Sequence, residues 1–183
     1  MEIDDLSDLL LLLLYAPGAS GKAGEPIKGI TRLQKMLFLL VQETEIGKKF
    51  DEKLSFQAYK YGPFSSELYD SIDFLKEMEL IEIRHQKYDA LTQKIEELEY
   101  EEDYGYVEEE SESDTIEVFE LGDVGKAMAE DIFEELDKNQ RNELEDIKKV
   151  VNSLPYLELI RFVYTKYPDY AKVSEIKEKV GVT

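Results

Sequence analysis

The first candidate for chemistry in this sequence is a glycine-rich loop, APGASGKAGEPIKG, at residues 16–29. Glycines that let backbone N–H groups converge, followed by a lysine, can hold a phosphate group. A phosphate-binding loop of this kind follows a strand and ends in Gly-Lys-Ser or Gly-Lys-Thr, whereas Ala23 follows Gly21 and Lys22 here. We therefore interpret residues 16–29 as a connecting loop and predict no nucleotide site in them.

The side chains that most often catalyse reactions are scarce. His85 is the only histidine, and the chain contains no cysteine. The sequence contains no Gly-x-Ser-x-Gly elbow and no His-Glu-x-x-His motif. Its run DYGYVEEESESD lacks the Asp-x-Asp-x-Asp-Gly order of a calcium-binding loop. Carboxylates are so abundant that a pair of them identifies no site. We predict a non-catalytic protein that uses no cofactor and no metal.

Acidic residues dominate the charge of the chain. The net charge is −20, and thirteen acids lie between Glu96 and Glu120 in a stretch without lysine or arginine. Without those thirteen residues the net charge would still be −7. An acidic surface repels nucleic-acid phosphates and anionic lipids. The charge therefore disfavours DNA as a partner.

A run of six leucines, from Leu9 to Leu14, is the most hydrophobic part of the sequence. A membrane-spanning helix needs about 20 apolar residues, and a signal peptide begins with basic residues rather than with acids such as Asp5 and Asp8. The run therefore predicts a core helix over residues 4–15. Because the chain also lacks cysteine, we expect a cytoplasmic protein without membrane contact.

Apolar spacing predicts the order of the remaining elements. Thr31 is expected to cap a helix that ends near Gly47, and LSFQAYKY is expected to form a strand that breaks at Gly62-Pro63. Ser65 should cap the next helix, which has an apolar stripe of Leu68, Ile72 and Leu75, widened by Phe74 and Met78. Strands are expected over 80–85 and 115–121, and helices over 123–137, 140–154, 156–167 and 172–180.

This order of helix, helix, strand, helix, strand, long loop and strand is that of a winged helix domain. The sequence thus predicts a mostly helical α+β fold, organised as a single domain over residues 1–183. Within it, residues 1–85 and 115–137 form a winged-helix-like core, residues 86–114 an acidic wing insertion, and residues 138–183 a C-terminal helical extension. The two wing strands can pair as an antiparallel hairpin.

Two stretches carry a resemblance to a known family. RLQKMLFLLVQE, followed by FQAYKYGPFSSELYDSIDFLKEMELIE, resembles a family of small prokaryotic proteins with a winged-helix-like core, some of which are uncharacterised and others of which belong to the Panacea group of SocA-like antitoxins. LIRFVYTKYPDY also resembles the C-terminal helix of some relatives. The acidic insertion at residues 86–114 departs from the family pattern. The resemblance implies a regulatory, antitoxin-like role.

Two functions remain open on these grounds. A transcription-regulator-like protein would place residues 65–79 in the major groove, but that segment has a net charge of −4. A basic patch around the second helix could still contact DNA, with Arg32, Lys35, Lys48, Lys49, Lys53 and Lys60 as its members. The alternative is a protein-protein interaction module with an acidic wing and no direct DNA binding.

The candidate interaction residues lie in the second helix and at the tyrosine-rich turn. Tyrosines at the turn could form a recognition surface, since tyrosine is common at interfaces, or could fasten the turn to the core. A partly exposed leucine helix would also predict a homodimer, so we expect a protein partner or a second copy. The candidate residues are Arg32, Lys35, Tyr59, Tyr61, Gly62, Pro63, Phe64 and Ser65.

Overall fold

The computed structural model describes residues 3–87, 115–174, 176–178 and 180–181. The protein is a mostly helical α+β fold with two small antiparallel sheets, as the sequence predicts. One hydrophobic core joins side chains from Ile3 to Val180. Among the helices of the described residues, none combines the length and the apolar character needed to cross a bilayer. The division into core, insertion and extension stays a prediction.

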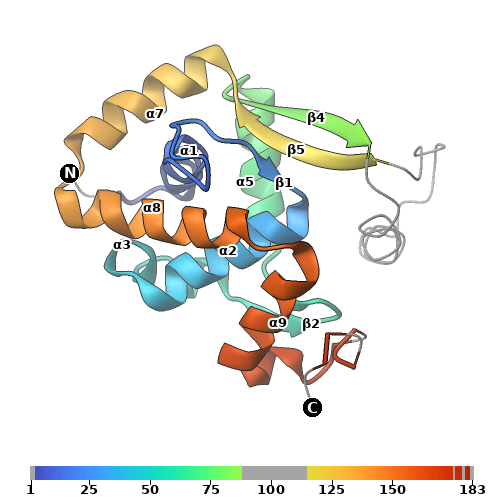
Figure 1. Cartoon of the computed structure of the whole chain (residues 1–183). Coiled ribbons are helices and arrows are strands. Elements are labelled where there is room, and N and C mark those ends of the chain that lie inside the picture. Colours follow the sequence, from blue (N-terminus) through green and yellow to red (C-terminus); the bar gives the residue numbers. More distant parts are fainter. Residues whose placement is uncertain (1–2, 88–114, 175, 179, 182–183) are drawn as a thin grey trace.

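Helix α1 (Leu6–Tyr15) lies in the middle of the core, where Figure 1 shows it almost end-on. Asp5 caps it by accepting a hydrogen bond from the Ser7 N–H at 2.8 Å. Residues 9–14 are all buried, each exposing at most 3% of its surface, because α1 contacts other helices and a strand around its circumference. No leucine of this run is therefore exposed, and the homodimer expected through them loses its basis.

Helix α2 (Ile30–Glu43) begins and ends earlier than the sequence suggests. Gly29, with a φ of 89°, occupies the N-cap position, and Thr31 lies inside the first turn. The helix ends before Thr44, whose side chain caps the short helix α3 (Glu45–Lys48). The predicted cap at Thr31 and the predicted end at Gly47 are both wrong, since Gly47 lies inside α3.

The tyrosine-rich turn is a hairpin rather than a broken strand. After helix α4 (Asp51–Leu54), strand β2 (Gln57–Tyr59) pairs antiparallel with strand β3 (Gly62–Phe64). Gly62-Pro63 therefore lies within β3 and does not interrupt a strand. Helix α5 (Glu67–Glu77) follows directly.

A three-stranded sheet holds the two wing strands. Strand β4 (Ile81–Lys87) pairs antiparallel with strand β5 (Thr115–Leu121), which confirms the predicted pairing. β4 continues to Lys87, so it includes the first two residues assigned to the insertion, and residues 88–114 lie outside the described residues. Strand β1 (Ile27–Lys28) lies within the segment that was expected to be a loop. It pairs with β5, so the order of the sheet is β1-β5-β4.

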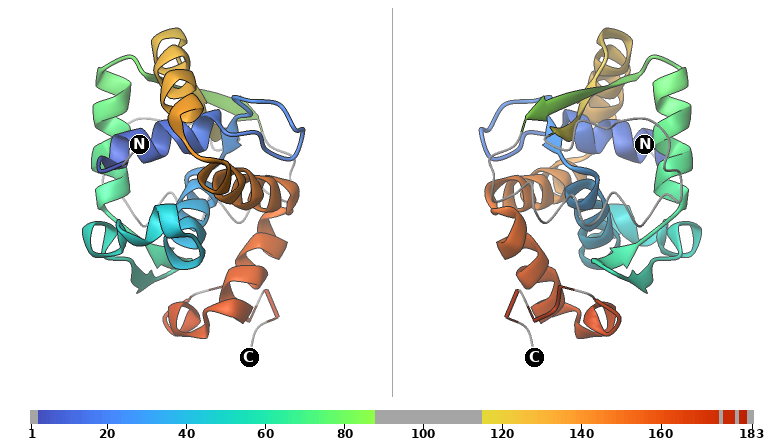
Figure 2. Two further views of the ribbon diagram at one scale, coloured as in Figure 1. Left: turned by 90° about the vertical axis from the view of Figure 1, so that its left-hand side faces the viewer. Right: turned by 90° about the vertical axis from the view of Figure 1, so that its right-hand side faces the viewer.

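Helices of the C-terminal half pack against this core. Helix α7 (Asp123–Glu135) lies against α1, and helix α8 (Lys138–Ser153) begins with a capping box and contacts α1 and α2. Helix α9 (Tyr156–Lys166) then leads away from α8 (Figure 2). The expected helix over 172–180 is not formed, because the described residues there adopt turns.

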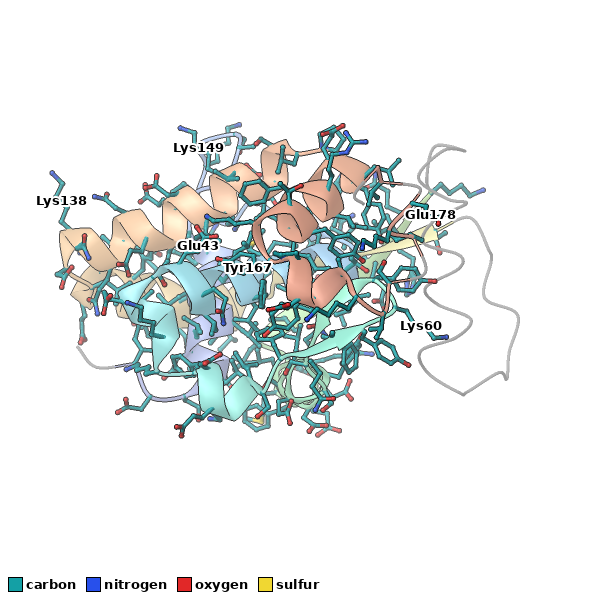
Figure 3. All side chains as sticks on the ribbon, turned by 90° about the horizontal axis from the view of Figure 1, so that it is seen from below. Glu43, Lys60, Lys138, Lys149, Tyr167 and Glu178 are labelled. Atoms are coloured by element: carbon teal, nitrogen blue, oxygen red, sulfur yellow. The ribbon has the colours of Figure 1, made fainter. Side chains whose placement is uncertain are left out.

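A 3₁₀ turn after α9, η1 (Pro168–Ala171), closes back onto α2. The ring of Phe38 in α2 meets the rings of Phe56, Tyr167 and Tyr170 with centroid separations of 4.7–5.2 Å. The Tyr167 hydroxyl also donates to Glu43 at 3.0 Å, and Figure 3 shows these two side chains together. The C-terminal segment is thus fastened to the helix that carries much of the core.

Candidate interaction surface

The backbone of β3 is built against two helices. Gly62 has a φ of 101°, and a Cβ atom there would lie 2.7 Å from Cε1 of Tyr164 in α9. Only glycine combines that conformation with so close a ring. The carbonyl of Pro63 accepts from the Lys35 ammonium of α2, with 3.4 Å between the atoms. Gly62 and Pro63 are both buried, so their role in the structure is to hold the hairpin against α2 and α9.

Ser65 continues this attachment. Its N–H donates to the Gln34 side-chain oxygen at 3.1 Å, and its carbonyl accepts from the Gln34 amide nitrogen at 2.9 Å. The N-cap position of α5 is Ser66, and the Ser65 hydroxyl instead lies 2.9 Å from a Glu67 carboxylate oxygen. The predicted capping role of Ser65 is therefore wrong, and Ser65 joins α5 to α2.

The aromatic side chains of the turn divide into two groups. Tyr61 is 5% exposed and belongs to the core. Tyr59 and Phe64 are half-buried, with ring centroids 5.1 Å apart, and the ring of Tyr69 in α5 lies 5.8 Å from that of Phe64. Tyr61 thus fastens the turn, while the other three form a half-buried row between hairpin and helix.

The predicted basic patch is not assembled on α2. Lys35 is only 3% exposed. Arg32 is half-buried, and its guanidinium donates to two backbone carbonyls at the end of α8, those of Val151 and Leu154. The two strongest candidates for a DNA-contacting surface are therefore engaged inside the fold, where their long side chains satisfy carbonyl groups.

Two of the lysines beyond α2 form ion pairs with acids. Lys48 forms an ion pair with Glu45, and Lys49 lies 3.1 Å from an Asp4 carboxylate oxygen. Lys53 is exposed on α4. A cluster of cations large enough to follow a phosphate backbone is thus not present among these side chains.

Helix α5 carries the most distinctive exposed surface. Leu68, Ile72 and Leu75 face the core, as predicted. Phe74 and Met78 do not widen that buried stripe, since 50% and 56% of their surfaces are exposed. The acids Asp70, Asp73 and Glu77 are exposed around them, together with Lys76.

The described wing strands hold two of the thirteen acids. Glu120 forms an ion pair with Arg84 of the neighbouring strand, which lowers the pKa of its carboxyl group. Glu117 lies opposite His85 in the neighbouring strand. Burial raises the pKa of the Glu117 carboxyl, although the charges of His85 and Lys76 act to lower it. These two acids therefore take part in the sheet, and the other eleven lie outside the described residues.

The sequence did not identify Phe74 and Met78 as surface residues. Their apolar character favoured burial, but only their position relative to α1 and the sheet decides which arc of α5 is covered. Compared with family models, with curated proteins and with solved structures, the chain matches none of them.

Proposed function

We propose that this chain is a non-catalytic regulatory protein with a winged-helix-like core that acts by binding another protein and makes no direct contact with DNA. The observation that carries this proposal is the solvent face of α5. That face presents Asp70, Asp73 and Glu77 around two exposed apolar side chains. Apolar side chains surrounded by charged ones are typical of protein interfaces.

The order of the elements supports the winged-helix-like part of the proposal. α1, β1, α2, α5, β4 and β5 occur in the chain order of a winged helix, with α3, α4 and the β2–β3 hairpin between α2 and α5, and β1 joins the two wing strands in one sheet. In that arrangement α5 occupies the position of the recognition helix. The resemblance to the Panacea group favours a regulatory, antitoxin-like role, because its members use such a core.

The charge of α5 is the reason to prefer a protein over DNA. A recognition helix brings its solvent face within a few ångströms of two phosphate backbones, and affinity comes from lysine and arginine side chains placed there. Here three carboxylates occupy that face, and Arg32 and Lys35 are turned into the fold. Each carboxylate near a phosphate adds repulsion that salt can only screen.

Anisotropy of a labelled duplex pool tests this proposal. The intact protein and a variant lacking residues 96–114 are titrated at low and at moderate salt, after circular dichroism has shown that both are folded. We expect neither protein to bind. Salt-sensitive binding by both would show a DNA-contacting surface that the acids leave open, and binding by the deletion variant alone would show one that residues 96–114 cover. Binding by the intact protein would overturn the proposal, whereas binding by the deletion variant alone would leave it standing, because the intact protein would still make no contact with DNA.

A further inference from the structure

We infer that the exposed face of α5 is a docking site for a cationic amphipathic helix of a partner protein, with Phe74 and Met78 as its apolar anchors. This inference rests on the proposed function, since it names the surface and the class of partner. It also adds a claim that can fail separately. The protein could act through protein contacts elsewhere while α5 stays uncovered.

Phe74 and Met78, the C-cap residue of α5, lie four residues apart, so their side chains are neighbours at the C-terminal end of the helix. A phenylalanine offers a rigid ring and a methionine adapts its shape, a combination that suits a helix laid across them. Elsewhere in the described residues the exposed large apolar side chains are valines and one methionine: Val124, Met128, Val150 and Val173. Phe74 is therefore the exposed aromatic residue among them, beside a second large apolar side chain.

The charges around this pair specify the partner. Asp70 and Glu77 lie one helical turn to either side of Phe74, and Asp73 precedes it. Lys76 is also exposed, and the charges of both Lys76 and Asp73 act on Glu117 of the sheet, so the three carboxylates and one lysine leave this face with a net negative charge. A helix with leucines on one face and lysines or arginines beside them would bury the apolar pair and place cations at the carboxylates. A second copy of this chain fits less well, because its net charge of −20 would oppose association.

The α5 face is held in place before any partner arrives. Ser65 is bonded to α2 at one end of the helix, and at the other end the Leu80 N–H donates to the Leu75 carbonyl at 2.9 Å. The Gly122 N–H then donates to the Leu80 carbonyl at 3.0 Å, which joins this end to the start of α7. A partner would therefore lose little binding energy to ordering this surface.

The test uses a fluorescein-labelled leucine-lysine peptide of about five helical turns as the probe, with the intact protein. The double variant F74S/M78S should weaken binding roughly tenfold or more, as loss of central anchors does. The matched variant V150S/V173S removes two exposed apolar residues elsewhere and should change binding less than about twofold. Both pairs are exposed, so both variants should keep the thermal stability of the parent.

A second pair of variants separates local from general charge attraction. D70N/D73N/E77Q should weaken binding at low salt, whereas D131N/E134Q/E135Q, which removes three exposed charges from α7, should have a much smaller effect. Equal losses in both, with no effect of F74S/M78S, would mean that the peptide recognises only net charge and would overturn the inference. Amide shift changes centred on residues 70–78 in an NMR titration would support it, and changes centred elsewhere would contradict it.

Sedimentation of the protein alone tests whether a second copy of this chain covers the α5 face. A dimer that F74S/M78S dissociates would assign this face to a second copy and would also overturn the inference. The anisotropy experiment with DNA bears on the proposed function and not on this surface. A protein that binds neither DNA nor the peptide would therefore retain the proposed function and lose the docking site.

Discussion

The side-chain amide of Gln34 pairs with the backbone of Ser65 as one strand residue pairs with another. It donates to the Ser65 carbonyl at 2.9 Å and accepts from the Ser65 N–H at 3.1 Å, and both residues are buried. The backbone between hairpin and α5 thus has its polar groups satisfied by α2. A buried pair of this kind fixes where α5 begins relative to the core.

Replacing Gln34 by methionine should lower the free energy of unfolding by about 2–4 kcal/mol, because a buried N–H and a buried carbonyl lose their partner. The matched variant Gln42→Met changes a half-buried residue of the same helix, whose amide lies 3.2 Å from Asp51 in an exposed contact. It should cost less than about 1 kcal/mol. Urea denaturation measures both. Equal losses would show that the Gln34–Ser65 pair adds no stability beyond an ordinary surface contact.

Gly62→Ala should destabilise the protein more than Gly24→Ala. Both glycines have a positive φ, 101° and 72°, so both substitutions strain the backbone. A Cβ at Gly24 meets nothing within 4 Å, whereas at Gly62 it meets the Tyr164 ring. We expect Gly62→Ala to cost roughly 1–3 kcal/mol more, the usual range for overpacking. Thermal or urea unfolding checks this, and equal costs would show that the ring moves aside freely.

Lys148 is fully buried in α8, and its ammonium donates to the Leu14 carbonyl at the end of α1 at 2.6 Å. Burial lowers the pKa of this lysine to about 7, against the favourable charge of Glu25. In the unfolded chain the pKa returns to its ordinary value, so the unfolded state takes up a proton first as the pH falls from about 10.5. As the pH falls from about 10.5 to 7, this difference in proton binding therefore lowers the free energy of unfolding progressively.

Lys148→Met removes that pH dependence. The stability difference, variant minus parent, should increase by several kcal/mol, up to about 1.4 kcal/mol per pH unit, as the pH is lowered from 10 to 7, and should level off below 7. Chemical denaturation at a series of pH values measures it. Lys149→Met, at the neighbouring exposed position in Figure 3, is the control and should give a nearly flat difference. A flat difference for Lys148→Met as well would show that the ammonium stays protonated in the fold.

Glu25 should make the protein sensitive to acid. Burial raises the pKa of its carboxyl group, but hydrogen bonds from Ser20, Asn152 and Ala19 together outweigh burial and lower the pKa to about 2. Because the folded pKa is below the unfolded one, the stability it contributes is present above pH 4.5 and is lost as the pH falls toward 2.

Glu25→Gln should therefore cost about 1–2 kcal/mol at pH 6 and clearly less at pH 2.5, where the parent has lost most of this contribution. Denaturation at the two pH values measures this change. Glu52→Gln, at an exposed glutamate of α4, serves as the control. A Glu25→Gln cost that does not change between the two pH values would refute a lowered pKa.

The long elements could be predicted because their periodicity is strong. Alternation in LIEIRH and TIEVFEL identified β4 and β5, and helical spacing identified α2, α5, α8 and α9. The leucine run identified α1, and the turn at Gly122 marked the start of α7. Strand β1 could not be found in this way, since two residues carry no period. The helix ends were wrong by a few residues, because Gly29 and Thr44 set them through backbone geometry.

The candidate site was predicted less well, and the reason is tertiary packing. From the sequence alone, a lysine such as Lys35 is expected at the surface. In the fold, a second helix and a hairpin cover its aliphatic stem, and a backbone carbonyl accepts a hydrogen bond from its ammonium. Conversely, Phe74 and Met78 read as core residues until the covered arc of α5 is known. Pattern gives the face of a helix, but only its neighbours decide how wide the buried part of that face is.

The central position of α1 has a consequence for synthesis of the protein. Its leucines are covered by α5, β5, α7 and α8, and α8 ends at Ser153. Because these elements follow α1 in the chain, α1 stays uncovered during synthesis until α8 has been made, at roughly 5–20 residues per second. During those seconds six adjacent leucines are available to chaperones and to other nascent chains, although the finished molecule hides them completely.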